Sequence, residues 1–284
     1  MDQLSGELVV VATPIGNLGD LSERARDVLE HADVLCCEDT RRTRVLLSAK
    51  GIAARGRLVS IHAHSEAEKA AWVVARVSAG ATVAYVSDAG TPGVSDPGQR
   101  LVSAVAASGN RVTTVPGPSA ALAALVVAGL PMDRFCVEGF LPRKGSDRAQ
   151  RLEALRIEER TTVVFETAPR AAATLADLAA ALGDRPAALC RELTKRHEEV
   201  RRGTLCELAR DGLSGDGARG EIVLVIGGTS LPRAGDDDVA HAVALALSGG
   251  ATTRDAASEV ASSLGVSRRR AYEAALRHGT GESE

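Results

Sequence analysis

The chain has 284 residues, with 34 lysines and arginines against 37 aspartates and glutamates, and a formal net charge of −3 at pH 7. This length exceeds what a single hydrophobic core usually supports, so we expect two compact domains and a small appendage. The mildly acidic balance argues against a uniformly basic nucleic-acid-binding surface, and three Phe, two Tyr and one Trp argue against base stacking as the main mode of recognition.

The longest apolar run, residues 120–130, is much shorter than the roughly 20 residues of a membrane-spanning helix. The N-terminus lacks a basic segment followed by an apolar one, so we expect a soluble cytoplasmic protein with no membrane partner. The cysteines are odd in number and show no C-x-x-C spacing, which favours buried reduced thiols over a metal site. They are Cys36, Cys37, Cys136, Cys190 and Cys206.

Residues 1–117 alternate short β-branched runs with apolar residues at helical spacing. Strands are expected at residues 8–12, 34–37, 58–62, 82–87 and 111–115. Strand and helix alternation of this kind predicts an α/β domain with a mainly parallel sheet and helices on both faces.

Residues 118–230 predict a second α/β domain, whose strand order cannot be read from the sequence. Strands are expected at 134–139, 162–166, 187–191 and 221–226, and helices near 148–157 and 170–182. A Gly-Gly-Thr-Ser run at 227–230 is followed by Pro232 and Gly235, and this turn-rich stretch predicts a domain boundary.

Residues 236–284 predict a helical tail with helix-turn-helix spacing. Capping signals stand at residues 252–255 and at Ser267, and the helix after Ser267 opens with three arginines, 268–270. Two interpretations remain open: a small helical domain that packs on the body, or a module that contacts nucleic acid.

Gly- and Pro-rich loops follow three of the expected strands, at residues 13–17, 87–98 and 116–120. Ligands of open α/β sheets bind at such loops. The loop at 87–98 contains three glycines and two prolines, and it is longer than a structural turn requires. Asp88 offers a carboxylate there to ribose hydroxyls or to a cationic centre, so we predict a ligand site.

Eight short motifs carry a resemblance that runs in order from residue 6 to about 228. They lie at residues 13–18, 38–41, 87–92, 116–118, 139–142, 165–167, 191–195 and 220–221. With these motifs the chain resembles the tetrapyrrole methylase superfamily, and within it the branch that 2'-O-methylates a cytidine ribose in the decoding region of 16S ribosomal RNA. One departure is Ser65, which stands where that branch usually has Asn after two histidines.

The resemblance implies two unlike α/β domains with a small C-terminal helical domain, a homodimer, and S-adenosylmethionine bound between the α/β domains without a metal. It implies that the cofactor contacts Pro14, Asp88, Ala89, Gly90, Thr91, Ser119, Ala120 and Phe165. It also implies 16S rRNA, or the small ribosomal subunit, as the partner. Arginine forks match phosphate oxygens, so the candidate substrate contacts are Arg41, Arg42, His64, Arg143, Lys144 and Lys195.

His62 and His64 share one face of an expected strand end, a spacing that also suits a metal. No third ligand is suggested nearby, so loop histidines or substrate contacts are favoured.

Methyl transfer from a sulfonium is an in-line displacement, so positioning is the larger part of catalysis. A ribose 2'-hydroxyl must also lose its proton, which a nearby base would assist. The candidate bases are Asp39, Glu66, Glu166 and Glu192. Pairs such as Asp39–Arg41 and Glu192–Lys195 are also compatible with purely structural ion pairs.

Two other functions remain open at this point. One is a precorrin or uroporphyrinogen-type methylase on the same scaffold, although such enzymes usually carry a Gly-Asp-Pro loop in place of the Ser-Asp-Ala-Gly-Thr-Pro at 87–92. The other is a non-catalytic RNA-binding module, because a fold does not guarantee turnover.

Overall fold

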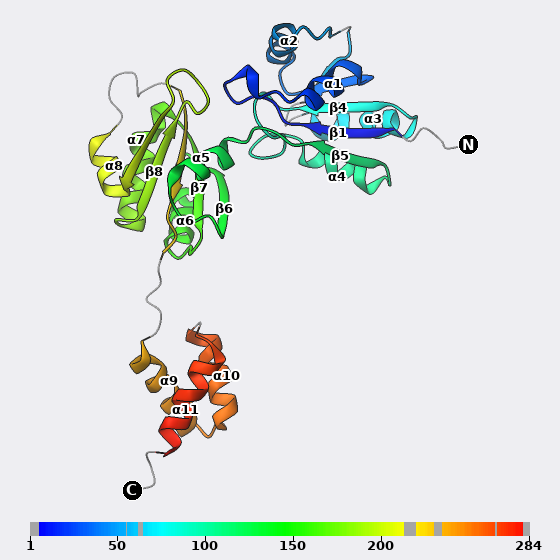
Figure 1. Cartoon of the computed structure of the whole chain (residues 1–284). Coiled ribbons are helices and arrows are strands. Elements are labelled where there is room, and N and C mark those ends of the chain that lie inside the picture. Colours follow the sequence, from blue (N-terminus) through cyan, green and yellow to red (C-terminus); the bar gives the residue numbers. More distant parts are fainter. Residues whose placement is uncertain are drawn as a thin grey trace. The chain divides into compact units, whose positions relative to one another are not determined.

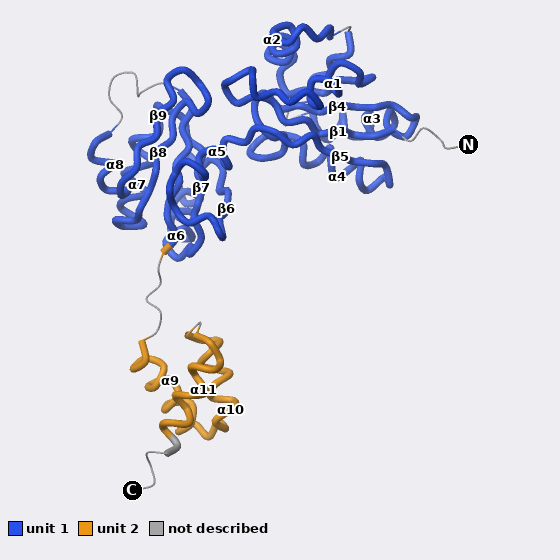
Figure 2. The backbone as a smooth tube through the Cα atoms, viewed as in Figure 1, with its two compact units in different colours: residues 1–228 blue, residues 229–284 orange. Residues whose placement is uncertain are grey.

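The computed structural model describes residues 6–54, 56–61, 65–212, 220–229, 235–264 and 266–280, apart from the side chains of the last two. The chain forms two compact units, one up to residue 228 and one from residue 229 onward (Figure 2). The first unit holds two β-sheets, and the second is helical (Figure 1).

The first sheet has the strand order β3-β2-β4-β1-β5. Its strands are β1 (Glu7–Val11), β2 (Val34–Cys37), β3 (Leu58–Ser60), β4 (Thr82–Val86) and β5 (Arg111–Val115). All four pairings are parallel, which confirms the prediction from strand and helix alternation. The third strand ends before the expected His62, which lies outside the described residues.

Helices cover both faces of this sheet because successive strand residues point to opposite sides. On one face, Val9 and Ala84 pack with α1 (Glu23–His31) and α2 (Thr40–Ala49). On the other face, Leu8 and Tyr85 pack with α3 (Glu66–Ser78) and α4 (Gln99–Ala107). A 3-10 turn, η1 (Leu18–Asp20), follows the first loop.

The second sheet is mixed and has the order β6-β7-β10-β8-β9. Its strands are β6 (Phe135–Phe140), β7 (Thr161–Thr167), β8 (Pro186–Arg191), β9 (Glu199–Thr204) and β10 (Glu221–Ile226). Only the pairing of β6 with β7 is parallel among these strands. The helix α5 (Ala120–Ala128) packs on one face. The other face carries α6 (Ser146–Arg156), α7 (Ala168–Leu182) and α8 (Leu205–Asp211).

The two sheets of the first unit are joined by direct contacts. Ile15, from the loop after β1, belongs to the same buried cluster as Leu193 and the apolar residues of α5. A Cβ atom on Gly16 would lie 2.4 Å from Lys195 Cγ, so only glycine permits this close approach. The Thr91 hydroxyl also donates a 3.1 Å hydrogen bond to the Pro118 carbonyl.

The helical unit consists of α9 (Asp236–Ser248), α10 (Thr253–Leu264) and α11 (Arg268–Thr280) around a small apolar core. Thr252 Oγ1 accepts from the Asp255 amide at 3.2 Å, and Ser267 Oγ accepts from the Arg270 amide at 3.3 Å. Both predicted capping signals are therefore confirmed.

None of the helices in the described parts of the chain is both long and apolar enough to span a membrane. Three of the cysteines, Cys36, Cys37 and Cys190, are buried free thiols, as expected, whereas Cys136 is half-buried and Cys206 is exposed. Burial raises the pKa of the Cys36 thiol to about 12, and the neighbouring Cys37 adds to this shift.

Candidate functional site

A cavity of about 350 Å³ lies in the first unit, and residues from both sheets line it. The part of the unit that contains the first sheet contributes Ile15, Glu38, Arg42 and the loop after β4. The part that contains the second sheet contributes the start of α5, the ends of β6 and β7, and the start of β10. A volume of this size suits a small-molecule ligand.

The loop after β4 forms one wall of the cavity, and glycine allows its path. Gly90 has φ +79° and exchanges backbone hydrogen bonds of 2.9 and 3.0 Å with Thr13. A Cβ on Gly90 would also lie 3.3 Å from Ile15 Cγ2. The loop ends at Gly98, directly before α4. Gly98 has φ +132°, and a Cβ added to it would lie 2.6 Å from Tyr85 Cε1. These positions explain why glycine stands there.

Asp88 is held in place at the cavity by two neighbours. The Asp39 amide donates a 3.0 Å hydrogen bond to Asp88 Oδ1, and Arg42 Nη1 lies 3.5 Å from Asp88 Oδ2. Both partners belong to the segment after β2, the strand next to β4. The carboxylate is therefore fixed at the carboxyl end of the sheet, where we predicted a ligand contact.

Two further carboxylates stand on this wall that the sequence did not single out. Glu38 follows β2, and Asp96 lies in the same loop as Asp88. Burial raises the pKa of Asp96 to about 6, and the charges of Glu38 and Asp88 add to the shift. Burial and the Asp88 charge likewise raise the pKa of Glu38. This wall therefore favours positive charge in the cavity.

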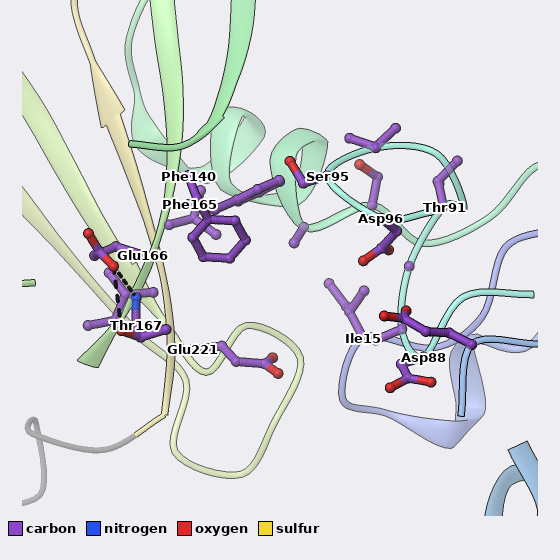
Figure 3. A pocket seen from close by; sticks show the side chains of 18 of the residues that line it. Ile15, Asp88, Thr91, Ser95, Asp96, Phe140, Phe165, Glu166, Thr167 and Glu221 are labelled. Carbon is purple, nitrogen blue, oxygen red and sulfur yellow. Dashed lines mark hydrogen bonds between the residues drawn. The ribbon is translucent and has the colours of Figure 1, made fainter. Parts of the chain in front are cut away.

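The opposite wall carries two aromatic side chains. The rings of Phe140 and Phe165 lie 5.7 Å apart between centroids, at an interplanar angle of 53°. Figure 3 shows both rings across the cavity from Asp88 and Asp96. A flat aromatic ligand group would fit against such rings, while the carboxylates face a cationic or hydroxyl-bearing group.

Most of the expected cofactor contacts meet at this cavity. Seven of the eight line it, namely Asp88, Ala89, Gly90, Thr91, Ser119, Ala120 and Phe165. Pro14 is not among the described lining residues, but its neighbour Ile15 is. Phe140 and Glu221 also line the cavity, and both belong to motifs that carried the resemblance without being assigned a role.

Glu66 has a structural role in this arrangement. It is buried, and its Oε1 accepts from the Gly98 amide at 3.0 Å and the Leu101 amide at 3.1 Å. It therefore caps α4 and fixes the end of the cavity loop. A carboxylate occupied in this way is a poor candidate for the base.

We expect Glu66→Ala to lower the free energy of unfolding by about 2–4 kcal/mol, because two buried amides lose their acceptor. Glu66→Gln keeps an acceptor oxygen and should cost less than half as much. Urea denaturation of the two variants beside the unchanged chain measures both effects. Equal stability of the alanine variant and the unchanged chain would contradict this assignment.

The other expected bases are also engaged. Glu166 lines the cavity, but its side chain is fully buried and bonds the Thr167 amide at 2.8 Å, the Thr174 hydroxyl at 2.7 Å and Arg170 at 3.3 Å. Glu192 accepts from Lys195 Nζ at 2.8 Å and from the Glu221 amide at 2.9 Å.

Asp39 caps α2 and pairs with Arg41 at 2.7 Å. The hydrogen bond from Arg41 lowers the pKa of Asp39 to about 2, so this carboxylate is a very weak base.

The expected substrate contacts are spread more widely. Arg42 lines the cavity, whereas Arg41 is exposed beside it and paired with Asp39. Arg143 and Lys144 are exposed in the turn before α6. Lys195 pairs with Glu192 and, at 3.2 Å, with Glu221. His64 lies outside the described residues, as does His62.

Residues 7–209 match the family model described as tetrapyrrole (corrin/porphyrin) methylases. The chain is 47% identical to "Ribosomal RNA small subunit methyltransferase I" of Mycobacterium tuberculosis (strain CDC 1551 / Oshkosh) over 96% of this chain and 95% of that protein. It is 44% identical to the protein of the same name from Mesorhizobium japonicum over 95% of this chain and 91% of the other.

Solved structures are also similar to this chain. One is uroporphyrin-III C-methyltransferase from Thermus thermophilus, at 26% identity and a TM-score of 0.54, covering 78% of this chain and 94% of that one. A Thermus thermophilus uroporphyrin-III C-methyltransferase complexed with S-adenosyl homocysteine aligns at 20% identity and a TM-score of 0.54, over 78% and 97% of the two chains.

Proposed function

We propose that this chain, which belongs to the tetrapyrrole methylase family of S-adenosylmethionine-dependent methyltransferases, methylates the 2'-hydroxyl of a cytidine ribose in the decoding region of 16S rRNA. The observation that carries the proposal is the similarity to proteins named ribosomal RNA small subunit methyltransferase I. It extends over nearly the whole chain, the helical tail included. Such a substrate would place the protein in the cytoplasm, with the ribosomes.

Tetrapyrrole methylation is the less favoured alternative. The solved uroporphyrin-III C-methyltransferase is 26% identical over 78% of this chain, whereas the rRNA methyltransferase relative is 47% identical over 96% of it. A non-catalytic RNA-binding role is also disfavoured, because a cavity of about 350 Å³ with facing carboxylate and aromatic walls suits a bound small molecule.

The lining residues fit the cofactor by their chemistry. Asp88 suits the ammonium, the sulfonium or the ribose diol of the cofactor, and Phe165 with Phe140 suits a flat base. When bound there, S-adenosylmethionine supplies an electrophilic methyl group on a positively charged sulfur. The residues of the chain orient the reactants in line and exclude water from the cavity.

Labelled cofactor tests the proposal. Small ribosomal subunits from a bacterial strain that lacks this modification are incubated with the protein and S-adenosyl-[methyl-³H]methionine. The RNA is then digested to nucleosides. We expect label in 2'-O-methylcytidine from one decoding-region nucleotide. Absence of label from the RNA, with the protein folded and the cofactor bound, would refute the proposal.

We further propose that the chain forms a homodimer, with the outer face of α5 as part of the contact. Leu122 and Val126 on this helix are 51% and 68% exposed, an unusual position for large apolar side chains that lie together on one helix. They also line a shallow groove with Val127 and Leu193. A second copy of the chain would cover this apolar surface.

We expect twice the mass of one chain by light scattering at low micromolar concentration, and the mass of one chain for Val126→Glu, because a buried unpaired charge opposes association. Val45→Glu on α2 is the matched control, because Val45 is 70% exposed and lies outside the groove. A monomeric unchanged chain would contradict the dimer. A dimeric Val126→Glu variant would contradict the surface.

The helical unit is proposed to supply RNA affinity rather than chemistry. Arg254, Arg268, Arg269 and Tyr272 line a concave surface on α10 and α11, and none of its described lining residues is a carboxylate. Guanidinium groups around a hollow of this kind suit phosphate oxygens.

A further inference from the structure

Among the described residues, the wall that the first sheet contributes to the cavity carries three carboxylates, Glu38, Asp88 and Asp96. Figure 3 shows Asp88 and Asp96 on the same side of the cavity, facing Phe165 and Glu221 across it. A group that accepts a proton from a substrate must face the cavity and must have an oxygen that is not already bound to protein donors. The contacts of each carboxylate decide between them.

Two of the three are occupied by structural contacts. Asp88 accepts from the Asp39 amide and pairs with Arg42. Glu38 is bonded by the Asp88 backbone. Across the cavity, Glu221 is paired with Lys195, and Glu166 is bound by three partners.

Asp96 differs from the others in its contacts. Among the described residues it forms no ion pair and accepts from no backbone amide. Its hydrogen-bond partner is the Ser87 hydroxyl, which also donates to the Ala89 carbonyl at 3.2 Å, so no fixed backbone donor occupies the Asp96 carboxylate. It is half-buried, so it is screened from bulk water while its carboxylate faces the cavity.

We propose that Asp96 is the general base that removes the proton of the 2'-hydroxyl during methyl transfer. This inference rests on the proposed function, because it assumes a ribose hydroxyl as the acceptor of the methyl group.

The backbone around Asp96 contacts the second sheet as well as the first. Ser95 is in the left-handed region with φ 63°, which is uncommon for a residue other than glycine. The pairing of β6 with β7 shifts register between Val137 and Gly139. A Cβ on Gly139 would lie 2.8 Å from Ser95 Oγ, so the glycine of the second sheet makes room for this loop. Strained positions held by their surroundings are frequent at active sites.

The pKa of Asp96 suits this role. Burial raises it to about 6, with further contributions from Glu38 and Asp88, and a base is most efficient when its pKa lies near the working pH. Asp96 is therefore mostly ionised at pH 7 and becomes protonated below pH 6. Among the described residues, the titratable and charged groups around it in the cavity region are Glu38, Arg42, Tyr85, Asp88, Glu166 and Glu221.

In the step itself, a carboxylate oxygen of Asp96 takes the hydroxyl proton as an oxygen lone pair forms the new bond to the methyl carbon. The electron pair of the breaking carbon–sulfur bond remains on sulfur. The products are the 2'-O-methyl ribose, the neutral thioether and protonated Asp96, which then loses its proton to water.

Asp96→Asn tests the proposal, because the amide keeps the shape but cannot take the proton. We expect the single-turnover rate of methyl transfer to small subunits at pH 7 to fall at least about a hundredfold. The dissociation constant for S-adenosylmethionine, measured by calorimetry without RNA, should change by less than about threefold, because the proposed role of Asp96 concerns the ribose 2'-hydroxyl and not the cofactor. The matched control is Asp27→Asn on α1, which is 73% exposed and should leave both values unchanged.

The pH profile gives a second readout that a purely structural role would not move. For the unchanged chain, we expect the rate to rise with slope one as Asp96 ionises near pH 6 and to level off above pH 7. Asp96→Asn should lose the plateau and rise with hydroxide concentration up to pH 9. Asp96→Glu should recover part of the rate at pH 7. Thermal unfolding of each variant verifies folding.

Two results would overturn the inference while the proposed function stands. One is a rate for folded Asp96→Asn within about threefold of the unchanged chain. The other is a cofactor affinity that falls in parallel with the rate, which would make Asp96 a cofactor contact. If the unchanged chain itself transfers no methyl group to RNA, the proposed function fails, and this inference fails with it.

Discussion

Replacement of Arg254, Arg268 and Arg269 together by alanine is expected to weaken binding to small-subunit RNA by roughly 100-fold to 500-fold at 0.1 M salt, with cofactor affinity unchanged. Removal of one arginine that binds a phosphate should reduce the slope of log affinity against log salt by about 0.7–0.9. At 0.1 M salt this corresponds to roughly fivefold to eightfold in affinity for each arginine. Filter binding or fluorescence anisotropy at several salt concentrations measures the affinity and the slope together.

The structure corrects which arginines belong in this test. The sequence grouped residues 268–270, but Arg270 is bound to Asp236 at 2.7 Å and so contributes to the packing of α11 on α9. Arg254 on α10 lines the concave surface instead. Arg269 is exposed and only loosely paired with Glu273, at 3.7 Å, so its charge can be redirected to a phosphate at little cost.

Arg270→Ala is the matched control, because it removes one arginine from α11 that does not line the concave surface. It should leave the salt slope nearly unchanged. If the triple variant and the unchanged chain share one affinity and one slope, the helical unit has only a structural role. Truncation after residue 228 gives an independent check, and loss of cofactor binding on truncation would contradict the division into two units.

Much of the fold of the first sheet could be predicted from the alternation of short strands with amphipathic helices. The strands of the first sheet alternate with amphipathic helices, which is enough to predict a parallel sheet. In contrast, β9 and α8 were not assigned, because the strand sequence Glu-Val-Arg-Arg-Gly-Thr is polar and lies at a sheet edge. The helix α5 was not assigned either, since its sequence is apolar on all sides and gives no periodic signal.

The site was predictable only in part, for a physical reason. Loops at the carboxyl ends of parallel strands must meet, so the sequence could place Asp88 at a ligand site. It could not separate the carboxylates by role, because burial and hydrogen-bond partners come from residues distant in the chain. Glu66, for example, accepts from amides 32 and 35 positions away along the chain, and this spacing gives no signal in the sequence.

Asp88→Ala is expected to lower the affinity for S-adenosylmethionine by at least about tenfold. A charge-assisted hydrogen bond to a carboxylate typically contributes about 1.5–3 kcal/mol, and tenfold corresponds to about 1.4 kcal/mol. Calorimetry with the cofactor alone measures this effect without any RNA. The fixed position of the carboxylate at the end of β4, between the Asp39 amide and Arg42, is the structural basis of the prediction.

Two further variants separate the charge of Asp88 from its structural bond. Asp88→Asn keeps an oxygen that can accept from the Asp39 amide, so it should retain the fold and still lose most of the affinity. Asp33→Asn is the matched control. Asp33 also accepts from a backbone amide, that of Thr82 at 2.8 Å, but Thr82 begins β4, whereas Asp88 follows the end of β4. If folded Asp88→Ala binds the cofactor as tightly as the unchanged chain does, Asp88 is not a cofactor contact. If only the alanine variant loses affinity, Asp88 acts by holding Asp39 in place rather than through its charge.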